Sequence, residues 1–506
     1  MPNRSFATDG LVFFVMSITP RHASSRALVV ILAFHACAML IGLGGGSLSH
    51  TDEYRTAERS REFLVTGDWT TVHDNFAPRF NKPPLQYWLT ALTIPWTEDR
   101  EWPVRVWSAL GSVAAVAAVA WLAATVAGAG SWAVPLAALF CLLDGGFSVA
   151  GRSALLDAWM MAFNTAAVAA ALAARAERRW WWAAAACVAA GAWQKAPIAL
   201  ALVAVVCVAR IAEGDRRFLR CPTFHLAMAG GLALTFSWPV WQWTLHGTEF
   251  LQVQYLDEMV RRSGALTEKP ARFHPWIYFT LLWDSWHLLW PAALGGLVCI
   301  PFTPLRRNRP LVVVAVLAAA LLAILSGLSF RSHRYAAYVV PMFSVVAAVA
   351  LTHVLAGRRL LVAVVLLTLP GLSAFPQVYD ARNRDKRPDL KRAASDLGAA
   401  YRPGERPLLV RAAKSDLRTD AMLFYGELPT AVLTVDAGRI ERAFARLEQP
   451  RAGFRGLTDR SCWPLIVAHF PEATRQAEFG PYVHWWAPRR DPSATSAGRS
   501  CRAEDP

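Results

Sequence analysis

The sequence is poor in lysine and lacks the cysteine and histidine spacings of common metal-binding motifs. Lysine occurs at six positions among 52 basic residues, so almost all of the positive charge is arginine. The eight cysteines include no Cys-x-x-Cys pair, and the histidines form no His-x-x-x-His or His-Glu-x-x-His spacing. These absences argue against a zinc finger and a zinc hydrolase. No internal repeat or nucleic-acid-binding motif is found either, so the net charge of +15 needs another explanation.

Long apolar segments are abundant. Hydrophobic residues make up 55% of the 506 residues, mean hydropathy is +0.28, and tryptophan occurs 22 times. Several apolar runs approach the roughly 20 residues that cross a bilayer as a helix. The composition therefore predicts an all-α polytopic membrane bundle of about eleven spans. These are expected at 27–43, 104–127, 131–149, 158–174, 180–193, 196–210, 224–245, 276–300, 310–328, 335–356 and 360–376.

The arginine clusters predict how these spans cross the bacterial inner membrane. Short loops after the fourth, sixth, eighth and tenth spans each carry several arginines. Placing every cluster in the cytoplasm gives one consistent threading and explains the net charge. Residues 180–210 then form a hairpin, with Lys195 and Pro197 at its outer tip. The same threading places the loop 44–103 and everything after 377 outside.

The chain after 377 changes character and predicts a small soluble α/β domain. An amphipathic helix is expected at 389–401, and strands at 407–411, 430–435 and 464–470. The expected parts are a cytoplasmic N-terminal segment, a transmembrane domain with the outer loop 44–103, a periplasmic α/β domain and a disordered tail. Their respective bounds are 1–26, 27–376, 377–492 and 493–506.

Two details of the termini follow. Met16 is an alternative start to Met1. Cys462 and Cys501 would lie in an oxidising compartment, where a disulfide is favourable. The position of Cys501 near the chain end nevertheless favours the unpaired state.

A polar stretch after the first span is the richest in groups suited to chemistry. It contains the acidic pair Asp52-Glu53 and then Lys82, which directly precedes two prolines. The acidic pair would also suit the start of a helix, where carboxylates complement the helix dipole. The helix at 53–65 is expected to lie along the membrane interface. Ionisable groups kept at the mouth of a membrane bundle usually serve function, which favours a chemical role.

The segment NKPPLQYW (81–88), together with the acidic pair and Gly67-Asp68-Trp69, resembles the signature of glycosyltransferase family 39. This family includes protein mannosyltransferases and the lipid A aminoarabinose transferases, and it has the GT-C fold. Weaker similarity continues through 151–159, 191–197, 255–262, 332–341 and 421–427. The chain departs from the family at Arg79 and Asn81, where tyrosine and glutamate are common, so sugar and acceptor recognition stay open.

The resemblance implies sugar transfer from a polyprenyl-phosphate donor to lipid A, another glycolipid, a glycan or a protein on the outer face. Asp52 and Asp157 match the acidic catalytic positions, and Lys82 matches the lysine that holds the lipid phosphate. A fixed cation stabilises the charge that develops on a departing phosphate, and an arginine fork binds phosphate in a bidentate manner. The implied substrate-binding residues are Glu53, Lys82, Arg262, Arg334, Tyr335 and Tyr338. Helix capping, solvated loop charges and membrane anchoring are the alternatives for these side chains.

No cofactor and no metal ion is expected. Asp52 and Glu53 have the carboxylates that Mg²⁺ or Mn²⁺ prefers, but Lys82 makes a metal less necessary for neutralising phosphate. The rival functions are a transporter or flippase of a lipid-linked anion and a non-catalytic assembly protein. Transporters often have repeated halves and charges at mid-membrane, and neither is seen. The enzymatic interpretation requires Asp52 and Lys82 to meet beside one lipid-accessible cavity.

Overall fold

The computed structural model describes residues 23–49, 51–261, 274–328, 331–383, 385–444 and 450–489. The chain divides into two compact units, which are described separately. The first unit comprises Met1–Leu43, Asn81–Leu85 and Val106–Arg382. The second comprises Gly44–Phe80, Gln86–Arg105 and Asn383–Pro506, so most of the loop 44–103 is grouped with the C-terminal domain.

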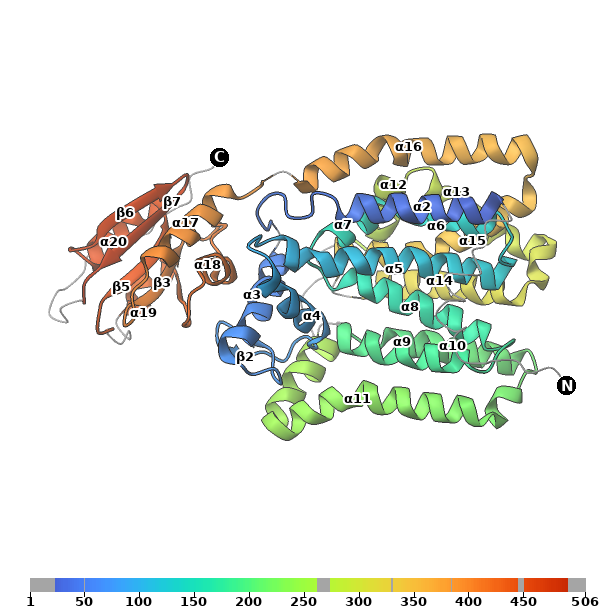
Figure 1. Ribbon diagram of the computed structural model, residues 1–506, viewed down its shortest axis with the longest axis horizontal. Coiled ribbons are helices and arrows are strands. Elements are labelled where there is room, and N and C mark those ends of the chain that lie inside the picture. The colour runs from blue at the N-terminus through green and yellow to red at the C-terminus, as the bar shows by residue number, and fades with distance from the viewer. Residues whose placement is uncertain are drawn as a thin grey trace. The chain divides into compact units, whose positions relative to one another are not determined.

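The first unit is a bundle of helices that run side by side (Figure 1). Its helices are α2 (Ala23–Leu40), α5 (Trp102–Ala127, from Val106 onwards), α6 (Ala133–Leu142), α7 (Gly145–Arg152), α8 (Asp157–Ala173), α9 (Trp180–Gln194), α10 (Ile198–Ala212), α11 (Pro222–Leu251), α12 (Ile277–Trp286), α13 (Leu289–Phe302), α14 (Arg309–Gly327), α15 (Val340–Val354) and α16 (Gly357–Asn383). A π-helix, η3 (Gln252–Arg261), follows α11, and a 3₁₀-helix, η5 (His333–Tyr338), precedes α15.

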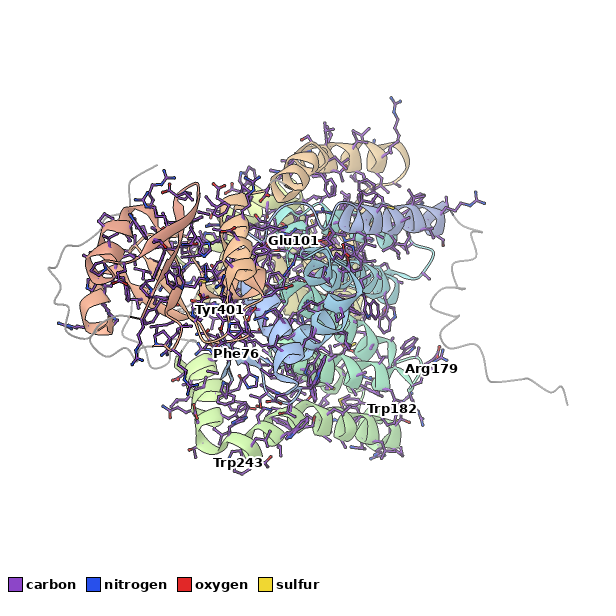
Figure 2. The ribbon with its side chains drawn as sticks, turned by 60° about the vertical axis from the view of Figure 1, so that its left-hand side comes forward. Phe76, Glu101, Arg179, Trp182, Trp243 and Tyr401 are labelled. Carbon is purple, nitrogen blue, oxygen red and sulfur yellow. The ribbon has the colours of Figure 1, made fainter. Side chains whose placement is uncertain are left out.

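Small residues let these helices approach closely. A methyl group added at Gly231 on α11 would lie 2.9 Å from Cβ of Ala185 on α9. One added at Gly151 on α7 would lie 2.6 Å from Cβ of Ser112 on α5. Close approach at small residues is typical of packing between membrane helices. Large apolar side chains instead cover outward faces, as Figure 2 shows for Trp182 and Trp243, which are each about half exposed.

The chain is a multi-pass membrane protein, and a helix lies at each of the eleven expected spans. By length and composition, four helices of the described residues are able to cross a membrane, or six if two bent pairs count as one span each. The bent pairs are α6 with α7, at 71°, and α12 with α13, at 117°. The total of eleven spans therefore stays a prediction.

The two bent pairs are joined where they break. Asp144 caps the N-terminus of α7 by accepting from the backbone N–H of Phe147, and it also accepts from the hydroxyl of Ser285 near the end of α12. Trp286 donates its indole N–H to the carbonyl oxygen of Phe140 at 2.7 Å. Polar groups freed by a helix break inside a membrane must find partners in the protein, and these contacts provide them.

The hairpin expected at 180–210 is confirmed. Helix α9 ends at Gln194, α10 begins at Ile198, and Lys195 and Pro197 form the turn between them. Proline cannot donate a backbone hydrogen bond and disfavours helix in the residue before it, which ends α9 at this point.

The second unit contains the expected small α/β domain. Its elements are α3 (Thr51–Thr66), β1 (His73–Asp74), β2 (Ala77–Pro78), α4 (Leu85–Thr93, from Gln86 onwards), α17 (Pro388–Ala400), β3 (Arg406–Arg411), α18 (Thr419–Gly426), β4 (Leu433–Asp436), α19 (Ile440–Phe444), β5 (Phe454–Asp459), α20 (Trp463–His469), β6 (Thr474–Phe479) and β7 (Tyr482–Ala487). The five-stranded sheet has the order β4-β3-β5-β7-β6. Strands β4, β3 and β5 are parallel, whereas β7 is antiparallel to both β5 and β6.

The strand expected at 464–470 is wrong, because this segment forms α20. Pro464 lies in the first turn of α20, where its missing N–H costs nothing. Leu465, Ile466 and His469 are the buried residues of the helix, and this spacing suits one helical face. The apolar run alone did not distinguish a short buried helix from a buried strand.

Helix α3 is largely enclosed by the protein, because ten of its sixteen residues are buried. Its expected position along the membrane interface stays a prediction. Bidentate pairing of Arg61 with Glu58 and the bond from Arg61 to the carbonyl oxygen of Leu428 anchor its charged side chains. Cys462 takes part in a disulfide bond, so the expectation that it stays unpaired is also wrong. Cys501 lies outside the described residues.

Candidate active site

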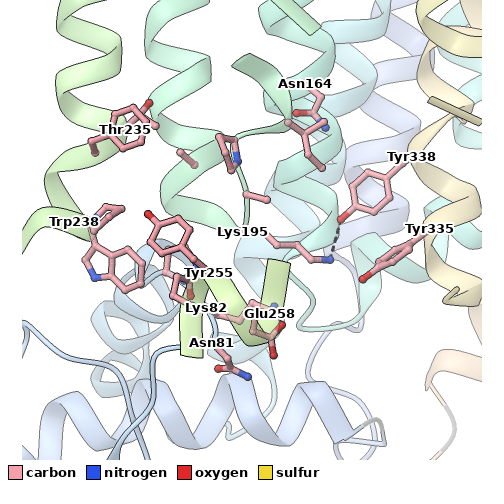
Figure 3. Close-up of a pocket in the computed structure, with 18 of the residues that line it drawn as sticks. Asn81, Lys82, Asn164, Lys195, Thr235, Trp238, Tyr255, Glu258, Tyr335 and Tyr338 are labelled. Carbon is pink, nitrogen blue, oxygen red and sulfur yellow. Dashed lines mark hydrogen bonds and ion pairs between the residues drawn. The ribbon is translucent and has the colours of Figure 1, made fainter. Parts of the chain in front are cut away.

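The first unit contains a cavity of about 270 Å³ with one polar end and apolar walls (Figure 3). The apolar wall comes mainly from α11 and α14 and includes Phe236, Trp238, Leu321 and Leu325. The polar end is lined by Asn81, Lys82, Lys195, Glu258, Tyr335 and Tyr338. Two lysines at the polar end of a membrane cavity with apolar walls suit a ligand with an anionic head and a hydrocarbon chain.

Lys195 is the centre of a tightly bonded cluster at this end. Its Nζ lies 2.6 Å from Oδ1 of Asp157 and 3.1 Å from the hydroxyl oxygen of Tyr338. Nζ also lies 5.0 Å from the ring centroid of Tyr335, within the range of a cation–π interaction. These contacts fix a flexible side chain in one position, so that its charge is held at the cavity wall.

Asp157 is the anionic partner of this cluster. It is the first residue of α8 and is buried. Its carboxylate accepts from Lys195 and from the hydroxyl of Tyr338, and Nη1 of Arg334 lies 3.6 Å from Oδ2. A buried carboxylate is stable only when it is paired. Asp157 therefore positions two cations, and it is Lys195, Tyr335 and Tyr338 of this cluster that line the cavity.

Lys82 reaches the same cavity from a different segment of the chain. Its Nζ forms an ion pair of 3.0 Å with Oε2 of Glu258 on η3. The two prolines after Lys82 restrict the backbone at this point. Since about a fifth of each side chain is exposed, an anionic ligand is able to compete with Glu258 for the ammonium group.

Four polar atoms on the walls of the cavity have no hydrogen-bond partner among the described residues. These are Oδ1 of Asn164, Oγ1 of Thr235, Nε1 of Trp238 and Oε1 of Gln254. Figure 3 shows Thr235 and Asn164 on opposite flanks of the upper part of the view, with Lys82 below them. Unsatisfied buried polar atoms are uncommon in native proteins, so these atoms suit a ligand that carries polar groups.

The structure brings several of the sequence-predicted site residues together. Asp157, Arg334, Tyr335 and Tyr338 form one cluster, and Lys82 lines the same cavity as Tyr335 and Tyr338. Sequence reasoning gave little weight to Lys195 and missed Glu258 and Asn164. The scarcity of lysine was the available signal for Lys195, since it is one of few lysines and follows an apolar helix. Arg262 lies outside the described residues.

Asp52 and Glu53 belong to the second unit. Asp52 is partly exposed at the start of α3, and its Oδ1 accepts from Nη1 of Arg55 at 3.2 Å. Glu53 is buried, and its Oε1 accepts from Nε of Arg105 at 3.0 Å. Arg105 also donates to the carbonyl oxygens of Gly45 and Ser47. The Glu53–Arg105 pair therefore fastens the segment before α3 and holds Asp52 at the helix start.

A metal site is not evident in the described part of the chain, where no three His, Cys, Asp or Glu side chains are grouped to hold an ion. Metal-independent chemistry stays a prediction.

Comparisons with known proteins identify the fold. A family model described as dolichyl-phosphate-mannose-protein mannosyltransferase matches residues 24–213. The structure is similar to that of ArnT from Cupriavidus metallidurans bound to undecaprenyl phosphate, with a TM-score of 0.71 and 18% identity over 93% of this chain and 99% of that one. The chain therefore has the fold of that ArnT structure. The resemblance of the first loop to family 39 is thereby confirmed.

Other similar proteins match less closely in structure or over shorter segments of the sequence. The oligosaccharyltransferase of Archaeoglobus fulgidus has a TM-score of 0.50 and 14% identity over 81% of this chain and 62% of its own. Among sequences, an undecaprenyl phosphate-alpha-4-amino-4-deoxy-L-arabinose arabinosyl transferase of Erwinia tasmaniensis is 32% identical over 28% of this chain and 26% of its own length. The Pseudomonas savastanoi pv. phaseolicola protein of that name is 35% identical over 18% of this chain and 17% of its own. The matched segments thus span well under two thirds of these curated relatives.

Proposed function

We propose that this protein is a membrane glycosyltransferase that moves a sugar from a polyprenyl-phosphate donor to an acceptor in the cell envelope. The observation that carries the proposal is the pairing of two fixed lysines, Lys82 and Lys195, at one end of an apolar membrane cavity. A polyprenyl phosphate has the matching chemistry, with a hydrocarbon chain for the apolar wall and an anion for the lysines. The ArnT structure with bound undecaprenyl phosphate has the same fold, which is consistent with this assignment.

In the proposed reaction, an acceptor oxygen forms a bond to the anomeric carbon of the donor sugar. The bond between that carbon and the phosphate oxygen breaks, and the polyprenyl phosphate leaves with the electron pair. Lys82 and Lys195 stabilise the negative charge that develops on this oxygen. Asp157 holds Lys195 in place, so that no reorganisation is needed when the charge appears. Arg334 adds a third cation through the same carboxylate.

Asp52 is proposed to accept the proton when the acceptor is a hydroxyl group. An acceptor phosphate is already anionic, and Asp52 would then orient the sugar. The expected meeting of Asp52 with Lys82 beside one cavity stays a prediction. The reaction is proposed to need no metal ion, because the lysines neutralise the phosphate.

The unpartnered polar atoms of Asn164 and Thr235 are proposed to bind hydroxyl groups of the donor sugar. Buried amide and hydroxyl groups lose hydrogen bonds with water when the cavity is dry, and sugar hydroxyls would replace them. The identity of the sugar depends on these groups, because a site built to hydrogen-bond a substrate rejects analogues that lack the partner.

The proposed active face is the periplasmic one. The arginine clusters favour this orientation, and the disulfide at Cys462 fits a domain in an oxidising compartment. Acceptors available there include lipid A, other glycolipids, glycans and secreted proteins.

Transport of a lipid-linked anion is the rival function. A comparison of donor binding and sugar transfer in two variants distinguishes a transferase from a transporter. Purified protein in nanodiscs is given a polyprenyl-phosphate sugar and an envelope lipid extract, and products are followed by mass spectrometry. We expect Lys82→Gln to lose donor binding and transfer, whereas Asp52→Asn keeps donor binding and loses transfer by about a hundredfold or more. Lys414→Gln, at an exposed lysine of the C-terminal domain, is the matched control. Full transfer by Asp52→Asn, or no transfer by the wild-type protein with any extract, would contradict the proposal.

A further inference from the structure

The second unit contains a separate cavity of about 530 Å³ that is lined mostly by polar residues. Residues of the α3 region form one wall, and residues around β3, β4 and α18 form the other. The lining side chains are polar except for Val432 and Leu433; the others are Thr51, Arg55, Asp74, Asn75, Arg411, Arg418, Thr419, Asp420 and Thr434. We call this the Arg418 cavity.

The two walls of the Arg418 cavity are fastened to each other. The side chain of Asn75 donates to the carbonyl oxygen of Val432 at 3.0 Å and accepts from its N–H at 2.7 Å. Asn75 has a positive φ of 57°, which asparagine tolerates better than most residues. Within the wall formed around α18 and β4, Thr419 and Thr434 share a hydrogen bond of 2.7 Å. The cavity is therefore a formed feature of the unit and not a gap between loose segments.

The charges around the cavity leave one cation without an anionic partner. Arg411 is paired with Asp436 at 2.7 Å, and Arg55 is paired with Asp52 at 3.2 Å. On the acidic side, Asp74 is held by Arg59 at 2.5 Å. Arg418 forms no ion pair and no side-chain hydrogen bond with the described part of the chain.

The negative charge of the cavity lining is also smaller than the number of its aspartates indicates. Burial and the neighbouring carboxylate of Asp74 raise the pKa of Asp420 to about 6. A carboxyl group with this pKa is partly protonated near neutral pH and is able to donate a hydrogen bond to a ligand oxygen. The cavity thus offers guanidinium groups, a shared proton and threonine hydroxyls, a combination that suits an anionic group on a hydroxyl-rich ligand.

The position of the cavity ties it to the proposed chemistry. Arg55 lines the cavity and donates to Asp52, and the cavity-lining Thr51 directly precedes Asp52 in the chain. The cavity is therefore bordered by Thr51 and Arg55, the residues one before and three after the proposed base Asp52.

We propose that the Arg418 cavity binds the phosphorylated saccharide portion of the acceptor. This inference rests on the proposed function, because only a glycosyltransferase has an acceptor. It assigns the acceptor, and not the donor, to the second unit. An arginine fork takes two phosphate oxygens at once, and the hydroxyls of Thr51 and Thr419 are placed for a sugar. The phosphate belongs either to a glycolipid headgroup or to a soluble sugar phosphate, because both present the same group.

The test uses the full-length protein in nanodiscs. Glucose 6-phosphate and glucose are titrated by calorimetry as soluble probes. Phosphatidylcholine vesicles that contain a phosphorylated glycolipid, or the same glycolipid after phosphatase treatment, are the membrane probes. We expect glucose 6-phosphate to bind and glucose to bind at least about tenfold more weakly. Preference for the phosphorylated vesicles over glucose 6-phosphate would identify the source as a lipid headgroup, and the reverse would identify a soluble sugar phosphate.

Arg418→Gln is expected to weaken binding of the phosphorylated probes by about tenfold or more, because it removes the unpaired charge. Arg439→Gln, an exposed arginine of the same domain, is the control that should leave binding unchanged. Binding of undecaprenyl phosphate by Arg418→Gln should equal that of the wild-type protein, which also shows that the variant is folded. Equal binding of glucose 6-phosphate by Arg418→Gln and wild type, or no binding by the wild type, overturns the inference. If the wild-type protein transfers sugar to none of the acceptors, the proposed function is contradicted instead.

Discussion

Asp157 Oδ1 lies 2.6 Å from Lys195 Nζ, although the two residues are 38 positions apart in the chain. The pair joins the start of α8 to the turn between α9 and α10. Both side chains are shielded from solvent, with 3% of Asp157 and 18% of Lys195 exposed. An ion pair in such a place is weak support for stability by itself, but removal of one partner leaves a buried charge.

Replacement of Asp157 by asparagine should therefore destabilise the protein. We expect a loss of about 3–5 kcal/mol, the usual cost of breaking a buried pair, and a weaker affinity for undecaprenyl phosphate because Lys195 is no longer fixed. Thermal unfolding in detergent measures the first effect, and lipid titration measures the second. Glu177→Gln breaks an exposed pair with Arg179 in the same unit and is the control.

The double variant Asp157→Asn/Lys195→Met gives the sharper result. It removes both charges, so it should be more stable than Asp157→Asn alone. If the losses of the two single variants simply add in the double variant, the pair is not coupled as described.

Glu258 should compete with the donor phosphate for the ammonium group of Lys82. Glu258→Gln removes the carboxylate that pairs with Nζ of Lys82. We expect undecaprenyl phosphate to bind this variant about fivefold more tightly, because the ligand no longer competes with an ion pair. Titration in nanodiscs at constant salt checks the change, and Glu249→Gln on the exposed face of α11 is the control. Weaker binding by Glu258→Gln would mean that Glu258 orients Lys82 for the ligand.

The helices of this protein were more predictable than its site. Apolar runs place helices at the eleven expected positions because burial in a bilayer imposes one composition on every span. The short apolar run at 464–470 lies in the C-terminal domain, where burial does not require a helix, so a strand was expected in place of the helix. The importance of Lys195 was also not visible, since its partners Asp157 and Tyr338 lie 38 and 143 residues away. Lys82 was found because its prolines are adjacent in the sequence, whereas its partner Glu258 is 176 residues distant.

The second unit should become less stable as the pH rises above about 5. Glu62 on α3 is buried, and its Oε1 has no hydrogen-bond partner. Burial raises its pKa from 4.5 to about 7. Between these values Glu62 binds more protons in the folded protein than in the unfolded chain, so its contribution to stability falls with rising pH and levels off above about pH 7. A shift of this size corresponds to at most ~3 kcal/mol.

Glu62→Gln should remove this part of the pH dependence, because glutamine does not ionise. We expect the unfolding temperature of the variant to fall less between pH 5 and pH 7.5 than that of the wild type, measured in matched buffers of constant ionic strength. Glu472→Gln, an exposed residue of the C-terminal domain, should keep the wild-type slope. Parallel slopes for Glu62→Gln and wild type would show that other groups control the decline.

Thr235 offers a direct test of whether the unpartnered polar atoms in the cavity of the first unit contact the sugar. Valine has nearly the same shape as threonine, so Thr235→Val removes the unpartnered hydroxyl and leaves the packing of α11 intact. We expect affinity for the sugar-bearing donor to fall about fivefold, the usual loss of one hydrogen bond, whereas affinity for undecaprenyl phosphate without a sugar stays unchanged. Thr125→Val on α5 is the matched control, since that hydroxyl already bonds to the carbonyl oxygen of Trp121. Equal losses for both ligands would place Thr235 beside the lipid and not beside the sugar.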